Sequence, residues 1–133
     1  MSENVILIEE NEDGTITTIK MNRLEKKNAM NFDLMVGLQK AIDKIERSKT
    51  RVVILTGGDE IFSAGIDLKF LTGQETDPEG VIPNLRIPAN FRYFANTWIQ
   101  PLFTKIEKME KPTIAKIKGY CFGMAFELAL ACD

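Results

Sequence analysis

Histidine is absent from this chain of 133 residues. Ser-His-Asp and Cys-His nucleophilic systems both depend on an imidazole base, so neither can be assembled from these residues. Histidine is also the commonest ligand of transition metals, and we therefore predict no metal site. Any acid–base chemistry must come from carboxylates, lysine, tyrosine or cysteine.

Cysteine is scarce, and long apolar runs are missing. The two cysteines, Cys121 and Cys132, fit neither a CxxC motif nor a zinc-type spacing. They predict buried free thiols in a reducing, cytoplasmic environment. No stretch approaches the roughly 20 apolar residues of a transmembrane helix, and the first residues lack the features of a signal peptide. The sequence therefore predicts no membrane partner.

The chain also lacks a large excess of positive or negative charge. The chain has 17 Lys and Arg residues against 19 Asp and Glu residues, for a net charge of −2. Because the basic residues are scattered, they form neither the basic stripe of a nucleic-acid-binding protein nor a polybasic membrane anchor. A composition of 44% hydrophobic and 27% charged residues is typical of one soluble globular domain.

The first half of the chain predicts a hairpin followed by a crossover. Strands over 4–9 and 15–21 flank Asp13-Gly14, a pair that favours a tight turn. Asn31 can cap a helix whose apolar residues recur at helical spacing. The apolar run 51–56 ends in Gly57-Gly58 and predicts a strand buried on both faces. Strand, helix and strand in this order indicate an α/β fold.

The second half alternates helices, a loop and a strand. We predict a short helix over 67–71, a long loop over 72–90, and a helix over 91–109 that Pro101 should kink. A strand over 113–117 and an apolar helix over 123–132 follow. The chain has no internal repeat.

Two segments place small residues between the end of a strand and the start of a helix. Ala64-Gly65 occupies this position in the segment 61–70, and Gly119 and Gly123 do so in 111–133. Backbone N–H groups there can approach a ligand without obstruction by side chains. If both segments aim an N–H at one developing oxyanion, each donor contributes about 3 kcal/mol. Such donors need no titratable side chain.

These segments resemble the crotonase superfamily, the enoyl-CoA hydratase/isomerase family. The matching blocks are TIKMNRLEKKNAM (18–30), FSAGIDLK (62–69) and KPTIAKIKGYCFGMAFELALACD (111–133), in the family's order and separation. The resemblance covers essentially the whole chain. It implies a ββα spiral core of two stacked sheets flanked by helices, of which residues 1–133 are the amino-terminal part, truncated after the helix bearing Glu127.

The resemblance also implies roles for individual residues. The backbone N–H groups of Ile66 and Met124 match the two oxyanion-hole donors. Glu127 matches the first catalytic glutamate of the hydratases, and we expect it to be desolvated between Phe126 and Leu128. A glutamate that satisfies helix donors is the competing interpretation. The family usually has glycine where Met124 stands, so Met124 and Phe126 leave the shape of the acyl pocket open.

Further residues are expected near coenzyme A. The resemblance places Lys26, Lys27 and Asn28 beside the adenine and phosphates, and Lys69 after the first oxyanion segment. Each lysine has an equally good interpretation as a solvated surface charge. Asp67 is a candidate substrate contact, although an N-cap explains it better. The remaining candidates for substrate binding are the small residues of the two oxyanion segments, Ala64, Gly65 and Gly123.

The resemblance implies an enzyme that adds water across the double bond of a 2-enoyl-CoA thioester. A double-bond isomerase of the same family is the first alternative, and a non-catalytic acyl-CoA-binding module or inactive fragment is the second. The family's second acid lies beyond Glu127 on a segment that these residues do not include. No cofactor is implied other than coenzyme A as part of the substrate, and the full-length enzyme is expected to form trimers or dimers of trimers.

Overall fold

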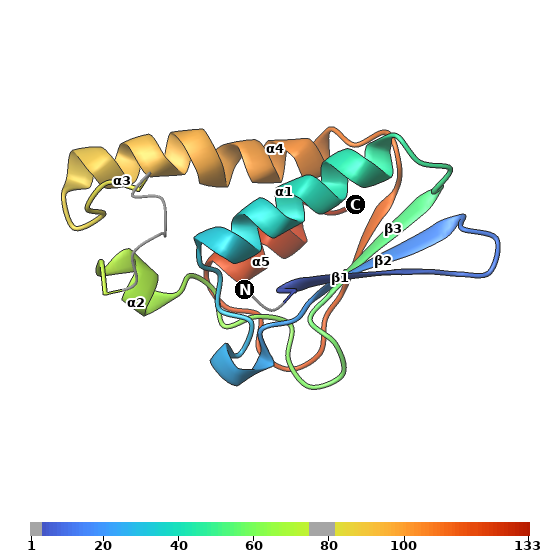
Figure 1. Ribbon diagram of the computed structural model, residues 1–133, viewed down its shortest axis with the longest axis horizontal. Helices are drawn as coiled ribbons and strands as arrows, with labels where there is room; N and C mark the ends of the chain where they lie inside the picture. Colours follow the sequence, from blue (N-terminus) through green and yellow to red (C-terminus); the bar gives the residue numbers. More distant parts are fainter. Residues whose placement is uncertain (1–3, 75–81) are drawn as a thin grey trace.

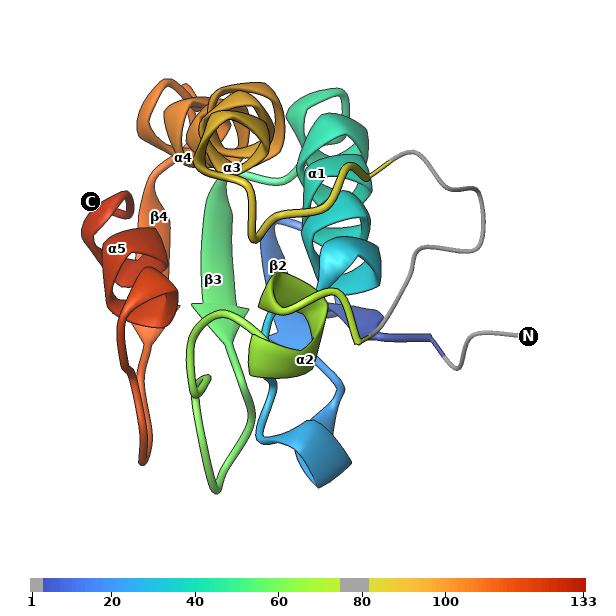
Figure 2. The same ribbon diagram turned by 90° about the vertical axis from the view of Figure 1, so that its left-hand side faces the viewer.

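The computed structural model describes residues 4–74 and 82–133, which form one sheet covered by helices. The strands are β1 (Ile6–Glu10), β2 (Ile16–Met21), β3 (Val52–Thr56) and β4 (Thr113–Lys116), and they lie in this order across the sheet. The helices α1 (Phe32–Glu46), α3 (Pro88–Phe94) and α4 (Gln100–Glu107) cover one face (Figure 1). Helix α5 (Met124–Leu130) lies beside β4 at the end of the sheet (Figure 2).

The predicted hairpin and crossover are both present. Strands β1 and β2 pair antiparallel from Ile6↔Met21 to Glu10↔Thr17. The turn between them is closed by hydrogen bonds between Asn11 and Ile16, and Gly14 supplies a φ of 68°. Strands β2, β3 and β4 are parallel, with α1 as the crossover between β2 and β3.

Helix α1 follows the predicted pattern. The side chain of Asn31 accepts a hydrogen bond from the N–H of Leu34 at 3.1 Å, as an N-cap should. The apolar residues at helical spacing are buried against the sheet, namely Leu34, Met35, Leu38, Ala41, Ile42 and Ile45. The cap and the apolar stripe therefore determine where this helix begins and which face it buries.

The long helical rod of the second half begins earlier than predicted and continues through Pro101. It starts at Pro88, whose fixed φ suits the first turn of a helix. A π-helical segment, η2 (Ala95–Ile99), joins α3 to α4 directly before Pro101. Here Gln100 donates to the carbonyl of Ala95, five residues back. The proline, which has no N–H to donate, is thus accommodated by a π turn.

The loop predicted over 72–90 can be compared with the structure only in part. Residues 75–81 lie outside the described residues, and residues 88–90 belong to α3. The short helix α2 (Leu68–Leu71) precedes the loop, as predicted from the sequence.

The second stacked sheet of the expected spiral is represented by short contacts. Within the described ranges, two isolated parallel bridges, Met30↔Ile66 and Ser63↔Cys121, lie outside the four named strands. They join the loops that follow the parallel strands. The bridges therefore form a second, small layer of pairing beyond the end of the main sheet.

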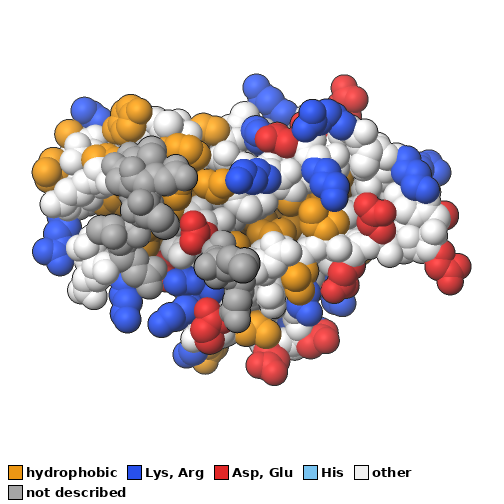
Figure 3. Space-filling view, viewed as in Figure 1, with side chains coloured by type: hydrophobic (Ala, Val, Ile, Leu, Met, Phe, Trp, Pro, Cys, Tyr) orange, Lys and Arg blue, Asp and Glu red, His pale blue; other side chains and the backbone are white. Residues whose placement is uncertain are grey.

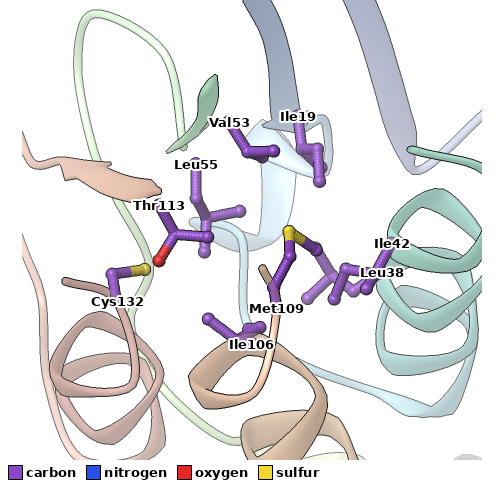
Figure 4. A pocket seen from close by; sticks show the side chains of 9 residues that line it. All are labelled: Ile19, Leu38, Ile42, Val53, Leu55, Ile106, Met109, Thr113 and Cys132. Atoms are coloured by element: carbon purple, nitrogen blue, oxygen red, sulfur yellow. The ribbon is translucent and has the colours of Figure 1, made fainter. Parts of the chain in front are cut away.

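The core between the sheet and the helices is tightly filled. Nine side chains surround a small crevice there: Ile19, Leu38, Ile42, Val53, Leu55, Ile106, Met109, Thr113 and Cys132 (Figure 4). Its interior has room for about one water molecule. An acyl chain cannot enter it, so any thioester must bind elsewhere. Both cysteines are free thiols, as predicted, but each is half-buried where full burial was expected. Partial burial raises the pKa of each.

Candidate active site

Three loops meet at the carboxyl ends of the parallel strands. They are residues 22–31 after β2, 57–67 after β3 and 117–123 after β4. The first includes the 3₁₀ segment η1 (Leu24–Lys26). Because parallel strands end at the same edge of a sheet, all the residues predicted for the site lie on these loops or on the helices that follow them.

Asn28 holds the first two loops together. Its side chain is fully buried, and its φ of 51° lies in the left-handed region that Asn tolerates better than most residues. The Nδ2 group donates to the carbonyls of Gly57, Ile61 and Phe62 at 3.1, 3.4 and 3.1 Å. The Oδ1 atom accepts from the N–H of Arg23 at 2.8 Å.

The expected contact of Asn28 with coenzyme A stays a prediction, but its side chain is turned into the protein. All of its polar atoms are occupied by backbone groups, and no part of it reaches the surface. Its role is to determine the path of the loop over 57–62, which leads into the first oxyanion segment.

Ser63 ties the two oxyanion segments to each other. Its N–H donates to the carbonyl of Tyr120 at 2.9 Å, and its carbonyl accepts from the N–H of Phe122 at 3.3 Å. Its hydroxyl donates to the carbonyl of Asn28 at 2.7 Å and accepts from the N–H of Gly65 at 3.1 Å. Sequence reasoning missed this residue, because a small polar residue in a loop carries no sign of its partners.

The N–H of Ile66 has no partner among the described residues, whereas the N–H groups of its neighbours are hydrogen-bonded. Ala64 donates to the carbonyl of Lys27, and Asp67 donates to the carbonyl of Met30. The carbonyl of Gly65 accepts from the N–H of Met30 at 2.7 Å. The bridge Met30↔Ile66 thus anchors the backbone on both sides of Ile66 and leaves its own N–H to point away.

The N–H of Met124 lies close to the segment that carries the N–H of Ile66. It is the first residue of α5, and its N–H has no partner within the described ranges. Counted from the parallel bridge Ser63↔Cys121, Ile66 and Met124 occupy equivalent positions three residues further on. A Cβ atom added to Gly65 would lie 3.6 Å from the nitrogen of Met124. The two segments therefore run side by side where the two N–H groups occur.

Two glycines make this approach possible. Gly65 has a φ of 92°, and a Cβ atom there would lie only 2.6 Å from the carbonyl oxygen of Phe122. Gly123, with a φ of 51°, makes the sharp turn into α5. Ala64, the third small residue of the prediction, directly precedes Gly65 and is half-buried.

Met124 and Phe126 point in different directions. The side chain of Met124 is 7% exposed and belongs to the hydrophobic core, so it packs away from the outer surface of α5. The side chain of Phe126 is 52% exposed. Of the two departures from the family pattern, only Phe126 is therefore available to line a pocket.

Glu127 lies in the first turn of α5 and is exposed. The prediction that neighbouring apolar residues desolvate it is wrong for these residues, because Phe126 is exposed beside it and only Leu128 turns inward. Sequence neighbours on a helix point in different directions, so an apolar flank does not bury the residue between. It lies three residues after Met124 on α5, one helical turn from the second candidate donor.

Asp67 is a capping and pairing residue, so the N-cap interpretation that the sequence favoured is confirmed, and a contact of Asp67 with substrate stays a prediction. One oxygen accepts from the N–H groups of Lys69 and Phe70, which makes it the N-cap of α2. The other accepts from Arg23, which also donates to the carbonyl of Ala29. Arg23 was not predicted as a site residue, because its partner is 44 residues away along the chain.

Opposing effects act on the pKa of Asp67. Burial by itself would raise the pKa, but the hydrogen bonds from Arg23, Lys69 and Phe70 outweigh it and hold the pKa below its ordinary value. Because the pKa is lower in the folded than in the unfolded protein, the carboxylate stabilises the fold at neutral pH. This contribution is lost as the pH falls below the ordinary value of 3.8 and through the folded pKa.

We expect Asp67→Asn to lower the free energy of unfolding by about 3 kcal/mol at pH 7, because it leaves the buried Arg23 without its anionic partner. The difference from the wild type should shrink at pH 3 and below. Urea unfolding of both proteins at the two pH values measures it. Asp43→Asn, which breaks the exposed pair with Lys105, is the control and should cost less than about 1 kcal/mol. Equal losses in the two variants would contradict this role of Asp67.

The lysines of the prediction are exposed at the rim of the site. Lys26 and Lys27 lie in and after η1, and Lys69 lies in α2. The Lys27 ammonium lies 5.6 Å from the centre of the Tyr120 ring. Basic side chains gather between α2 and the η1 segment in Figure 3. This arrangement suits an anionic group at the rim, and the assignment to coenzyme A stays a prediction.

The comparisons with known proteins agree with this fold. The family model described as enoyl-CoA hydratase/isomerase matches residues 11–133. The chain therefore belongs to the enoyl-CoA hydratase/isomerase family, as its resemblance predicted. No helix of the described residues is long and apolar enough to cross a membrane.

Relatives within the family differ in the reaction that their names give. A mitochondrial Delta(3,5)-Delta(2,4)-dienoyl-CoA isomerase of Mus musculus is 37% identical over 116 residues, which is 86% of this chain and 35% of the relative. A probable peroxisomal enoyl-CoA hydratase 1 of Arabidopsis thaliana is 32% identical over 138 residues, covering 100% of this chain and 44% of the relative. The chain thus spans a third to a half of these relatives.

Solved structures confirm the fold. An enoyl-CoA hydratase from Thermoplasma volcanium superimposes with a TM-score of 0.80 and 32% identity, covering 98% of this chain and 47% of that one. An enoyl-CoA hydratase/isomerase from Xanthobacter autotrophicus has the same TM-score at 28% identity and is covered to 44%. The predicted crotonase-type α/β fold is therefore confirmed, over a chain about half as long as these structures.

Proposed function

We propose that this chain contributes the oxyanion hole and one catalytic carboxylate of an enoyl-CoA hydratase. The observation that carries the proposal is a pair of N–H groups, those of Ile66 and Met124, that have no partner within residues 4–74 and 82–133 and lie on segments joined at Ser63. Both belong to rigidly hydrogen-bonded backbone, so they are preorganised before a ligand arrives. Glu127 lies one helical turn from the second donor.

In this mechanism the thioester oxygen accepts from both N–H groups. Water adds its oxygen to C3 of the 2-enoyl group, and the electron pair of the double bond moves toward the carbonyl, giving an enolate whose negative charge the two donors stabilise. One proton of the water stays on the oxygen at C3 and the other leaves to a carboxylate, while C2 takes up a proton that the family's second acid, outside these residues, would supply. Glu127 is suited to hold the attacking water or to accept its proton.

The isomerase alternative has support of its own. The dienoyl-CoA isomerase of Mus musculus shares 37% identity over the same segments. An isomerase needs the same enolate stabilisation but moves a proton between carbons instead of adding water. Product analysis separates the two reactions, because hydration gives a 3-hydroxyacyl thioester whereas isomerisation leaves the mass unchanged.

Glu127→Gln tests the proposal directly. A short-chain 2-enoyl-CoA is mixed with the chain, and loss of the conjugated thioester absorbance is followed. Turnover by the wild type would mean that a second acid comes from within residues 1–133 or from a neighbouring subunit. In that case we expect a fall of at least about 100-fold in the variant, since a positioned acid–base group contributes that much or more. The affinity for the thioester should change little.

Glu25→Gln is a matched control, because Glu25 is an exposed glutamate in η1. It should leave turnover unchanged. Binding of the thioester without turnover by the wild type would instead support an inactive part of the enzyme or a non-catalytic acyl-CoA-binding module. Turnover that survives in Glu127→Gln would contradict the role of this carboxylate.

Three further expectations belong with this proposal. Lys26, Lys27 and Lys69 would attract the phosphates of coenzyme A by charge. Trimers, or dimers of trimers, stay a prediction for the full-length enzyme. The cytoplasmic location also stays a prediction, because the names of relatives place some of them in mitochondria and others in peroxisomes.

A further inference from the structure

An open groove lies between strand β1 and helix α1, on the side of the sheet that the helices cover. Its volume is about 230 Å³, many times the space in the crevice of the core. Figure 3 shows hydrophobic side chains exposed between these two elements, with basic side chains along α1. The lining includes four apolar residues and two exposed lysines: Val5, Ile6, Ile8, Ala41, Lys40 and Lys44. We call this feature the β1–α1 groove.

Gly37 brings the helix close to the strand. A Cβ atom added there would lie 2.8 Å from Cγ1 of Ile6, which is closer than two carbon atoms can approach without a shift. Lys40, Ala41 and Lys44 follow Gly37 at spacings of three, four and seven residues, so all four lie on one face of α1. The face of the helix that contacts β1 therefore also carries the two lysines.

Strand β1 is an edge strand, and its backbone is open on the side away from β2. The carbonyl of Val5 accepts from the N–H of Asn22 on the β2 side at 2.8 Å. In an antiparallel pair every second residue bonds to the partner strand, and those between point away. The N–H and C=O groups of Ile6 and Ile8 therefore point outward and have no partner within residues 4–74 and 82–133. Such an edge is a template for an added strand.

The spacing of the two lysines matches the spacing of a strand. Lys40 and Lys44 are separated by about 6 Å along the axis of α1. Alternate residues of a strand are about 6.5–7 Å apart, and their side chains point to the same face. Helix α1 runs along the sheet in Figure 1. Two carboxylates at alternate positions of a strand added to β1 can therefore each meet one lysine.

A fatty acid and a second copy of this chain both fit the groove less well. A fatty acid has one carboxylate and no N–H group, so the carbonyls of Ile6 and Ile8 would stay unpaired. On the face that α1 covers, β1 carries Ile6, Ile8 and Glu10. The β1 strand of a second copy would thus offer one carboxylate for two lysines.

We propose that the β1–α1 groove binds an extended peptide segment with two acidic residues at alternate positions, which adds a strand to β1. The backbone of the segment exchanges hydrogen bonds with Ile6 and Ile8, and its two carboxylates pair with Lys40 and Lys44. None of these residues belongs to the three loops of the candidate active site. The inference therefore goes beyond the proposed hydratase chemistry and does not depend on it.

The probe is a synthetic peptide, acetylated and amidated, of sequence TEVET. At saturating peptide, we expect hydrogen exchange at the amides of Ile6 and Ile8 to slow at least tenfold, as measured by NMR. The amide of Leu7, which already faces β2, should change little. The same peptide with N-methyl groups on both glutamates should not bind, because it cannot donate to β1. Absence of binding at millimolar TEVET, or equal binding of the methylated peptide, would overturn the proposal.

Substitution of the lysines tests the match of charges. Lys40→Gln combined with Lys44→Gln should weaken the binding of TEVET about tenfold, because two exposed ion pairs are lost. Lys108→Gln changes an exposed lysine at the end of α4 and should leave the affinity unchanged. Equal effects of the two changes would contradict the assignment.

Two competing occupants have outcomes of their own. A dimer of the free chain in which the amides of Ile6 and Ile8 are protected would overturn the proposal in favour of a second copy. Decanoate that displaces TEVET at equal concentration would overturn it in favour of a fatty acid.

Discussion

Asn28→Ala should lower the free energy of unfolding by roughly 4 kcal/mol or more. The substitution leaves the carbonyls of Gly57, Ile61 and Phe62 and the N–H of Arg23 without their partner in a fully buried place. Each buried polar group left unsatisfied costs about 1–3 kcal/mol. This loss is a large fraction of the free energy of unfolding of a typical protein, which is about 5–15 kcal/mol. Urea unfolding followed by the fluorescence of Trp98 measures it.

The control for this prediction is another asparagine with a local role. Asn31 caps α1 by accepting one hydrogen bond from the N–H of Leu34, so Asn31→Ala should lower the free energy of unfolding by about 1 kcal/mol. Asn28→Asp should also be strongly destabilising, because a carboxylate cannot donate to three carbonyls. If Asn28→Ala costs no more than Asn31→Ala, the buried hydrogen bonds of Asn28 do not hold the loops together.

Gly65→Ala is expected to lower the free energy of unfolding by roughly 3 kcal/mol and to weaken the binding of enoyl thioesters. The added Cβ would lie 2.6 Å from the carbonyl oxygen of Phe122, so the two oxyanion segments must separate. A non-glycine residue at a φ of 92° adds backbone strain of about 1–3 kcal/mol. Separation of the segments should move the N–H groups of Ile66 and Met124 apart. Calorimetric titration with a 2-enoyl-CoA, with free coenzyme A alongside, measures the effect on binding.

Gly73 offers a control for backbone strain alone. Its φ is 71°, and a Cβ atom there would meet nothing within 4 Å. Gly73→Ala should therefore lower the free energy of unfolding by about 1 kcal/mol and leave thioester binding unchanged. If Gly65→Ala keeps full affinity for the thioester while its stability falls, the two N–H groups do not act together on the thioester oxygen.

Local patterns predicted the secondary structure well. The Asp13-Gly14 turn, the Asn31 cap and the alternating or helical spacing of apolar residues each act over a few residues, and all three features are present. The helix that begins at Pro88 was placed too late, because a proline-containing segment resembles a loop even where proline occupies the first helical turn. The π turn before Pro101 depends on hydrogen bonds that spacing alone does not reveal.

The errors in the predicted site concern polar residues. Asn28 and Asp67 were candidates for a ligand contact, and the structure shows both to be buried and engaged with protein groups. The N-cap of Asp67 is local and was favoured from the sequence, whereas its pair with Arg23 spans 44 residues and the bond from Asn28 to Gly57 spans 29, so no local pattern reveals them. Glu127 was expected to be buried because its neighbours are apolar, but only Leu128 faces the core.

The sequence by itself determined the family, the order of the elements and the two segments that form the candidate site. These properties depend on short motifs and on periodicity, which act over a few residues. Only the tertiary structure decided which N–H groups remain available and which polar side chains are used internally. Hydrogen-bond satisfaction and burial depend on segments such as 22–31, 57–67 and 117–123, which are distant along the chain and meet only when the parallel strands align.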